Sequence, residues 1–135
     1  MGTLYIVGTP IGNLEDLTIR ASRVLGQVDL VAAEDTRVTR RLLNHLGIKV
    51  RTASYHRHNW ERRIPELLAA LESGDVALVT DAGMPGVSDP GSELVARAAA
   101  MGFTVDVAPG PSAVTTAVAL SGLVPAKGDA DSFFF

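Results

Sequence analysis

A glycine- and proline-rich segment directly after an apolar run constrains the fold of this chain more than any other feature. The run is Val76–Val79, and the segment Thr80–Gly91 that follows it contains three glycines, two prolines and two aspartates. This composition cannot continue a strand, because proline lacks the backbone donor and glycine weakens extended structure. Asp89 and Pro90 suit the start of a helix, so the pattern predicts a strand, a turn and a helix. Such turns bind small ligands in open α/β sheets.

The same alternation of apolar runs and helical periodicity recurs along the chain. Five segments are predicted to be strands: Leu4–Val7, Val28–Ala33, Lys49–Tyr55, Asp75–Thr80 and Phe103–Ala108. Helices are predicted to begin near Thr18, Asp35, Asn59, Gly91 and Ser112. Strands that are continuously apolar are typical of a parallel sheet buried on both faces. We therefore expect an α/β fold with a five-stranded, mainly parallel sheet and helices on both faces.

Composition limits the kinds of protein that this chain can be. It has 135 residues, of which 47% are hydrophobic, and this is enough for one domain with its own core. Cysteine is absent, which excludes disulfides, thiolate metal sites and cysteine nucleophiles. There is no apolar stretch of membrane-spanning length and no targeting pattern at the N-terminus, so we expect a cytoplasmic protein without a membrane partner.

The last residues differ in character from the rest of the chain. A polar, glycine-containing stretch, Lys127–Asp131, precedes three consecutive phenylalanines, Phe133–Phe135. A free terminus rarely exposes such an apolar tail, because it invites association. We expect residues 1–124 to form one α/β domain, and residues 125–135 to form a linker and the start of a missing C-terminal domain.

In the predicted sheet, the strand-to-helix loops meet at the carboxyl edge and converge on one crevice. These loops are Gly8–Asn13, Glu34–Arg37, Thr80–Gly91 and Pro109–Ala113. The first, third and fourth loops contain no Lys or Arg, and Glu15, Asp16, Asp81 and Asp89 lie in or beside the first and third, so this edge would repel a phosphate. The spacing also matches neither a dinucleotide fingerprint nor a P-loop. Backbone donors beside carboxylates suit a ligand with ribose hydroxyls and a positive centre, and S-adenosylmethionine fits this description.

Basic residues gather in the first half of the chain. Ten of the 12 Lys and Arg residues lie at or before Arg63, and eight of them fall within residues 37–63: Arg37, Arg40, Arg41, Lys49, Arg51, Arg57, Arg62 and Arg63. Such a stripe binds nucleic-acid phosphates in some proteins and is only a solvated helical face in others. Composition alone leaves both interpretations open.

Several of these segments resemble the RNA-modifying branch of the tetrapyrrole (corrin/porphyrin) methylase superfamily. They are Leu4–Asp16, Ala32–Arg37, Ser54–His56, Thr80–Gly91 and Pro109–Ala113, and the resemblance extends over essentially the whole chain, in order. The resemblance implies S-adenosylmethionine-dependent methylation of a cytidine ribose 2′-hydroxyl in small-subunit (16S) ribosomal RNA, with this RNA or the 30S subunit as partner. It also implies a full-length homodimer, and cofactor contacts from Pro10, Asp81, Ala82, Gly83, Gly86, Val87, Ser112 and Ala113.

A ribose hydroxyl is a weak nucleophile, so its methylation benefits from a base or from a cation that stabilises the alkoxide. We expect Asp35 and His56 to handle the proton, and Arg37 to hold an RNA phosphate or the developing oxyanion. Glu34 is a further candidate at the same crevice. Alternatively, Asp35 only caps the following helix and pairs with Arg37. His56 and His58 have no third ligand nearby, so we expect no metal site.

Other interpretations remain open from the sequence. Trp60 could stack on a base, but its helical spacing with Ile64 and Leu67 favours packing against the core or another domain. The acceptor could be a tetrapyrrole or a protein side chain, because arginines also attract porphyrin carboxylates. A non-catalytic nucleotide- or RNA-binding module is the remaining alternative.

Overall fold

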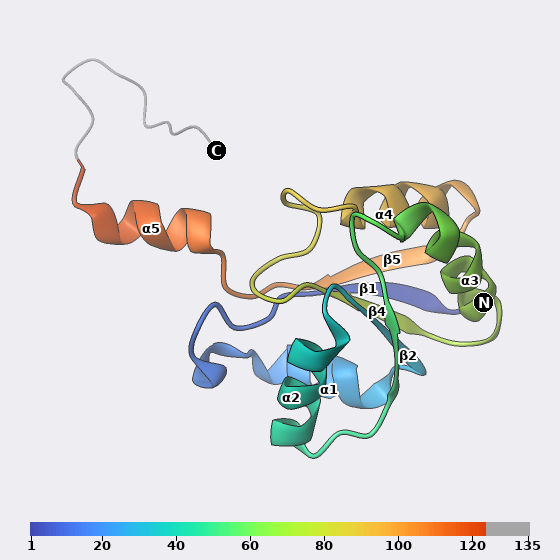
Figure 1. Ribbon diagram of the computed structural model, residues 1–135, viewed down its shortest axis with the longest axis horizontal. Helices are drawn as coiled ribbons and strands as arrows, with labels where there is room; N and C mark the ends of the chain where they lie inside the picture. Colours follow the sequence, from blue (N-terminus) through green and yellow to red (C-terminus); the bar gives the residue numbers. More distant parts are fainter. Residues whose placement is uncertain (124–135) are drawn as a thin grey trace.

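The computed structural model describes residues 1–123 and contains one five-stranded parallel sheet (Figure 1). The strands are β1 (Thr3–Val7), β2 (Leu30–Ala33), β3 (Arg51–Ser54), β4 (Val76–Val79) and β5 (Thr104–Ala108). They lie in the order β3-β2-β4-β1-β5, and each neighbouring pair is parallel. The predicted fold class is therefore confirmed. Residues 125–135, where we expected a linker and a further domain, lie outside the described residues.

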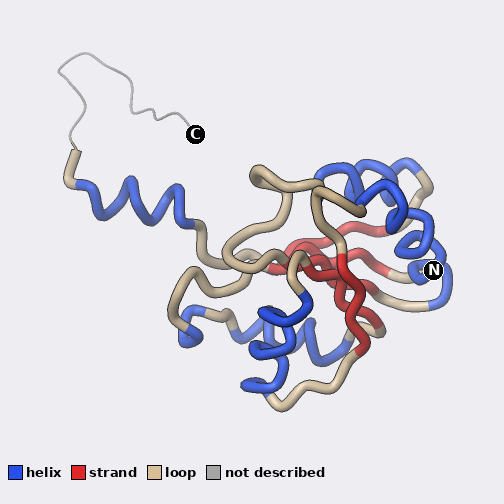
Figure 2. The backbone as a smooth tube through the Cα atoms, viewed as in Figure 1, coloured by secondary structure: helices blue, strands red, loops and turns tan. Residues whose placement is uncertain are grey.

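Helices cover both faces of the sheet, as predicted. They are α1 (Ile19–Gln27), α2 (Thr36–Leu46), α3 (Trp60–Ser73), α4 (Gly91–Ala100) and α5 (Ala113–Ser121). Helices α1 and α2 lie on one face and α3 and α4 on the other, whereas α5 extends away from the sheet and buries no residue (Figure 2). A short 3-10 helix, η1 (Leu14–Asp16), was not expected from the sequence. None of these helices is long and apolar enough to cross a membrane.

Each face of the sheet carries its own hydrophobic layer. Leu43 of α2 and Val79 of β4 belong to one layer, and Leu67 of α3 and Leu78 of β4 belong to the other. Successive side chains of a strand point to opposite faces, so a strand covered on both faces must be apolar at every position. This explains the unbroken apolar run in β4, all four residues of which are buried.

Side-chain caps and a left-handed residue set several helix ends where the sequence predicts them. The Oγ1 atom of Thr18 accepts a hydrogen bond from the backbone N–H of Ala21 at 3.0 Å and starts α1. Asp35 caps α2 in the same way, by accepting from the N–H of Arg37 at 2.9 Å. Helix α2 ends at Gly47, whose φ of 69° lies in the region that favours glycine.

Two other predicted helix starts differ in detail. Asn59 precedes α3, but its side chain does not cap the helix; its Oδ1 accepts from the N–H of His56 at 2.8 Å and its Nδ2 donates to Ser54 at 2.9 Å. Pro90 lies one residue before the first helical position of α4, and the carboxylate of Asp89 binds two backbone N–H groups of the preceding loop and helix. Tertiary contacts of the loops outweigh simple capping at both places.

Candidate cofactor and substrate site

The loops after β1 and β4 are joined at the carboxyl edge of the sheet. Thr9 and Gly83 exchange both backbone hydrogen bonds, each at 3.0 Å, and form an isolated antiparallel bridge. The buried hydroxyl of Thr9 also donates to the carbonyl of Thr80 at 3.1 Å. These bonds hold the turn after β4 against the turn after β1.

The loop after β5 packs against the same two loops, backbone to backbone. A Cβ atom placed on Gly8 would lie 2.7 Å from the backbone of Gly110 and from the sulfur of Met84. A Cβ on Gly83 would lie 3.5 Å from the carbonyl oxygen of Pro111. Glycine is therefore required at Gly8, because any side chain there would push the three loops apart.

The loop after β2 is tied to the loop after β4 by two side chains. The backbone N–H of Asp81 donates to Oε1 of Glu34 at 3.1 Å, and Oδ1 of Asp81 accepts from the N–H of Asp35 at 3.0 Å. Strand β3 ends beside β2, because the N–H of Tyr55 donates to the carbonyl of Ala33 at 2.8 Å. The predicted convergence of the loops at one edge of the sheet is confirmed.

The chain leaves neighbouring strands towards opposite faces of the sheet, and this opens the carboxyl edge. Strand β4 lies between β1 and β2. It leads to α4 on one face, whereas β1 and β2 lead to α1 and α2 on the other. Open α/β sheets bind ligands where their connections diverge in this way. Two cavities lie at this edge, one on the α2 side and one on the α4 side.

The α2 cavity has a volume of about 420 Å³. It is lined by Thr9, Pro10, Gly12, Asn13, Leu14, Val38, Thr39, Arg41, Leu42, Thr80 and Asp81. Pro10 and Asp81, two of the expected cofactor residues, lie in its wall. Arg41 brings a cation to it, although the loops after β1 and β4 that line it have none. The helical spacing from Val38 to Arg41 and Leu42 places all three on one face of α2.

The α4 cavity has a volume of about 490 Å³. Its walls are formed by Glu34, Arg57, Trp60, Gly86, Ser88, Asp89, Pro90, Ser92 and Glu93. Gly86 is the expected cofactor residue that faces this cavity. The loop here holds Ser88 at a φ of 63°, which is the one positive φ of a non-glycine residue within residues 1–123. Unusual backbone conformations of this kind cluster at ligand-binding sites.

The other expected cofactor residues line neither cavity. Gly83 is buried in the bridge to Thr9, whereas Ala82 and Val87 are exposed on the same loop. Ser112 and Ala113 lie at the start of α5, immediately after Pro111. The structure thus places Pro10 and Asp81 at the α2 cavity and Gly86 at the α4 cavity, and the other expected residues on the loops around them.

The carboxylate of Asp35 is held by Arg37. Its Oδ1 accepts from Nε of Arg37 at 3.2 Å and its Oδ2 pairs with the guanidinium at 3.0 Å. Hydrogen bonding to Arg37 lowers the pKa of Asp35, and the same pair raises the pKa of Arg37. The structure therefore contains the helix cap and ion pair that the sequence offered as an alternative. A lowered pKa makes Asp35 a weaker proton acceptor.

His56 presents a hydrogen-bond donor at its outer ring nitrogen. Its Nδ1 accepts from the backbone N–H of His58 at 3.1 Å. An accepting Nδ1 in a neutral imidazole leaves the proton on Nε2. The position of His56 follows from the pairing of Ala33 with Ser54, which places it beside the loop after β2. Within residues 1–123 no group of His, Asp and Glu side chains is arranged to hold a metal ion.

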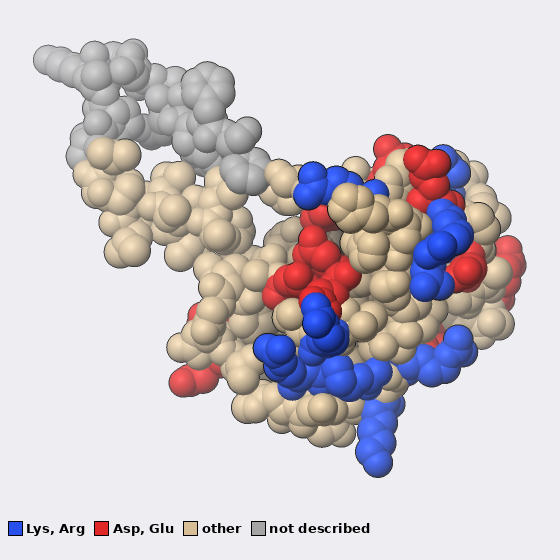
Figure 3. Space-filling model, viewed as in Figure 1, with Lys and Arg blue, Asp and Glu red and all other residues tan. Residues whose placement is uncertain are grey.

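The basic stretch is divided between structural and open positions. Arg40 donates to the carbonyl of Val50 at 3.3 Å, and Arg63 pairs with Glu66 at 2.8 Å. Three other arginines line cavities instead. Arg41 lines the α2 cavity, Arg57 lines the α4 cavity, and Arg57 and Arg62 line a cavity at the start of α3. Figure 3 shows acidic side chains gathered near the middle of this face, next to a band of Lys and Arg.

Comparisons with curated proteins relate the chain to ribosomal RNA methyltransferases. It is 55% identical over 128 residues to the ribosomal RNA small subunit methyltransferase I of Thermotoga maritima, covering 94% of this chain and 58% of that protein. It is 51% identical to the protein of the same name from Mesorhizobium japonicum, covering 98% of this chain and 44% of the relative. The chain thus spans about half the length of these relatives.

A solved structure and a family model agree with this relationship. The crystal structure of uroporphyrin-III-C-methyltransferase from Thermus thermophilus matches with a TM-score of 0.70 and 30% sequence identity, over 95% of this chain and 56% of that one. The family model of the Tetrapyrrole (Corrin/Porphyrin) Methylases matches residues 3–135. The parallel sheet, the joined loops and these matches place the chain in one group: it belongs to the tetrapyrrole (corrin/porphyrin) methylase family.

Proposed function

We propose that this chain forms the cofactor-binding part of a cytoplasmic enzyme that methylates the 2′-hydroxyl of a cytidine ribose in small-subunit ribosomal RNA. The observation that carries the proposal is the edge where the loops after β1, β2, β4 and β5 meet, with one cavity on the α2 side and one on the α4 side. Relatives named ribosomal RNA small subunit methyltransferase I support the choice of RNA as acceptor. We further propose that residues 1–124 are one domain of a longer, homodimeric protein.

The groups at this edge fit S-adenosylmethionine. The close approach of Gly8 to Gly110 brings the loops after β1 and β5 together backbone to backbone. Asp81 supplies a carboxylate for a hydroxyl or ammonium group of the cofactor. The residues proposed to hold the cofactor are Pro10, Asp81, Ala82, Gly83, Gly86, Val87, Ser112 and Ala113.

When bound, S-adenosylmethionine supplies an electrophilic methyl group. Apolar side chains of the α2 cavity, such as Val38 and Leu42, exclude water from the reacting groups. Arg37 has 84% of its side chain exposed, so its guanidinium is available to an RNA phosphate or to a developing oxyanion. Asp35 fixes the position of that guanidinium and accepts the proton of the ribose 2′-hydroxyl. His56 donates a hydrogen bond from Nε2. Because the pKa of Asp35 is lowered, the larger contribution falls to Arg37.

A methyl-transfer assay on undermethylated small ribosomal subunits tests this proposal. Because the chain spans 58% or less of these relatives, the assay compares it with a version extended beyond Phe135. We expect the extended version to place labelled methyl on a cytidine ribose, and Arg37→Ala to lower the rate by about a hundredfold. Label on a base, or no transfer by the extended version, would contradict the proposal.

A tetrapyrrole is the second candidate acceptor. The match to a uroporphyrin-III-C-methyltransferase at a TM-score of 0.70 is the observation that favours it. The same assay with uroporphyrinogen in place of ribosomal subunits separates the two, because the proposal expects transfer to RNA alone.

A further inference from the structure

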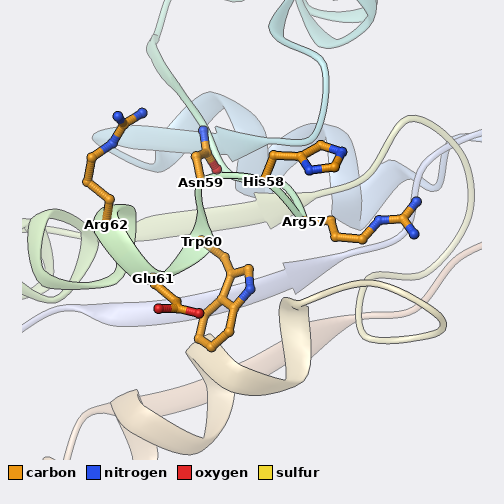
Figure 4. Close-up of a pocket in the computed structure, with 6 residues that line it drawn as sticks. All are labelled: Arg57, His58, Asn59, Trp60, Glu61 and Arg62. Atoms are coloured by element: carbon orange, nitrogen blue, oxygen red, sulfur yellow. The ribbon is translucent and has the colours of Figure 1, made fainter.

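An aromatic side chain stands between two cavities at the start of α3. Trp60, the first residue of that helix, lines the α4 cavity and also a cavity of about 310 Å³ formed by residues 57–62. Figure 4 shows its indole directed away from Arg62 and towards α4, with Arg57 extending beside it. The ring therefore forms a wall that a flat ligand can reach from the α4 cavity.

Core packing accounts for only part of the indole. Trp60 is partly buried and packs against the hydrophobic layer under α3. Its ring nitrogen has no hydrogen-bond partner among residues 1–123 and is not among the buried unpaired polar atoms, so it is open to solvent or to a ligand. One part of the Trp60 side chain is thus held by core packing, and the rest of the indole, including its nitrogen, lines a cavity.

Both basic and acidic side chains line the two cavities beside Trp60. Arg57 and Arg62 are exposed, and neither pairs with an acid among the described residues. The acids facing these cavities are Glu34, Glu61, Asp89 and Glu93. The carboxylates of Glu34 and Asp89 already accept backbone N–H groups, which offsets part of their charge.

We propose that Trp60, Arg57 and Arg62 form a subsite for one unpaired RNA nucleotide that flanks the methylated one. The base stacks on the indole of Trp60, and the adjoining phosphates lie towards the two arginines. The acids on the α4 side accept hydrogen bonds from ribose hydroxyl or base amino groups. This inference rests on the proposed function, because it assigns a binding role within the same RNA complex.

Three features favour RNA over other polyanions. Unpaired bases are commonly stacked on aromatic side chains by RNA-binding proteins. The α4 cavity also holds Glu34 and Gly86, so a nucleotide beside Trp60 would adjoin the joined loops. An anionic macrocycle would bring its carboxylates against Glu93 and Asp89, which disfavours a porphyrin at this place.

Tryptophan fluorescence provides a direct test, because Trp60 is the one tryptophan in the 135 residues. The chain is titrated with a short single-stranded RNA containing cytidine, and separately with inorganic polyphosphate. We expect RNA to quench the emission in a saturable way and polyphosphate to leave it nearly unchanged, since only bases stack. Equal quenching by both polyanions would overturn the proposal.

Variants separate stacking from charge, with binding of a labelled RNA as the readout. Trp60→Leu keeps apolar packing and should weaken binding by about five- to 150-fold, whereas Trp60→Phe keeps a ring and should stay within about threefold. Arg57→Gln should weaken binding, whereas Arg23→Gln on α1, where Arg23 contacts Gln27, should not.

The outcomes also distinguish this subsite from the proposed function. Binding of labelled RNA without any change in Trp60 fluorescence would overturn the subsite and leave RNA methylation in place. Absence of RNA binding by both readouts, in the chain and in the version extended beyond Phe135, would count against both. Equal affinities of Trp60→Leu and the unchanged chain would also overturn the stacking role.

Discussion

Thr9 and Gly83 exchange two backbone hydrogen bonds of 3.0 Å at the carboxyl edge of the sheet, although they lie 74 positions apart in the sequence. The bridge joins the loop after β1 to the loop after β4, and Gly8 brings in the loop after β5 by its contact with Gly110. The proposed cofactor site therefore depends on backbone contacts between loops more than on any one side chain.

The first prediction concerns Gly8. Gly8→Ala places a methyl group 2.7 Å from the backbone of Gly110, so we expect a loss of about 2 kcal/mol in the free energy of unfolding and weaker S-adenosylmethionine binding. Gly26→Ala in α1 is the matched control. Its Cβ would have 3.9 Å to the nearest atom, and alanine should raise stability by about 0.5–1 kcal/mol. Thermal unfolding of the two variants measures both effects, and equal changes would argue against the tight loop contact.

The second prediction separates the capping and chemical roles of Asp35. Asparagine is also a good N-cap, so Asp35→Asn should leave the free energy of unfolding nearly unchanged, whereas Asp35→Ala should lower it measurably. If the carboxylate takes part in catalysis, both variants of the extended protein should lose methyl-transfer activity. Full activity of Asp35→Asn would restrict Asp35 to its structural role.

The pH dependence of stability should differ between the unchanged chain and Asp35→Asn. The pKa of Asp35 is lowered from 3.8 by Arg37, so the stability that it contributes is present above pH 3.8 and is lost as the pH falls through the lower, folded-state value. Denaturant unfolding of the unchanged chain and of Asp35→Asn between pH 2 and pH 5 should show this acid-dependent component in the former alone. Parallel pH curves would contradict it.

The third prediction concerns Tyr55, whose hydroxyl donates to the carbonyl of Pro90 at the start of α4. Burial raises the pKa of Tyr55 from 10.0 to about 12. Its contribution to stability is therefore complete below pH 10.0 and is lost as the pH rises towards 12. Tyr55→Phe should remove this alkaline loss and cost about 1 kcal/mol at neutral pH. Spectroscopic titration of the phenol checks the raised pKa.

The fourth prediction compares arginines that line cavities with arginines that bind other residues of the chain. RNA binding by the extended protein should weaken with salt, and Arg41→Gln or Arg62→Gln should each reduce the slope of log K against log salt by about 0.7. Arg40 and Arg63 contact Val50 and Glu66, so replacing them should lower stability more than it changes the slope. Similar slopes for Arg41→Gln and Arg40→Gln would contradict this division.

The sequence predicts the fold better than it predicts the use of individual side chains. Apolar runs such as Val76–Val79 strongly favour buried parallel strands. Thr18 and Gly47 set helix ends through contacts with residues near them in the sequence, so these ends are also predictable. In contrast, the side chain of Asn59 can either cap α3 or accept from the backbone N–H of His56. Which of these it does depends on where β3 ends, and the sequence does not show this.

The candidate site shows the same limit. The carboxyl edge follows from the parallel sheet, so the loops could be predicted to meet there. That Arg41 reaches a cavity while Arg40 binds the carbonyl of Val50 depends on how α2 is rotated against β3. The 3-10 helix Leu14–Asp16 carries no apolar periodicity that would distinguish it from a loop.

Calorimetric titration of the chain with S-adenosylmethionine, and separately with a nucleoside triphosphate, tests the central claim most directly. We expect a saturable heat with S-adenosylmethionine alone. Asp81→Asn, which can still accept from the N–H of Asp35, should weaken this binding by about tenfold, whereas Asp106→Asn on β5 should not. Binding of the triphosphate as tight as that of S-adenosylmethionine, or no difference between Asp81→Asn and Asp106→Asn, would contradict the account.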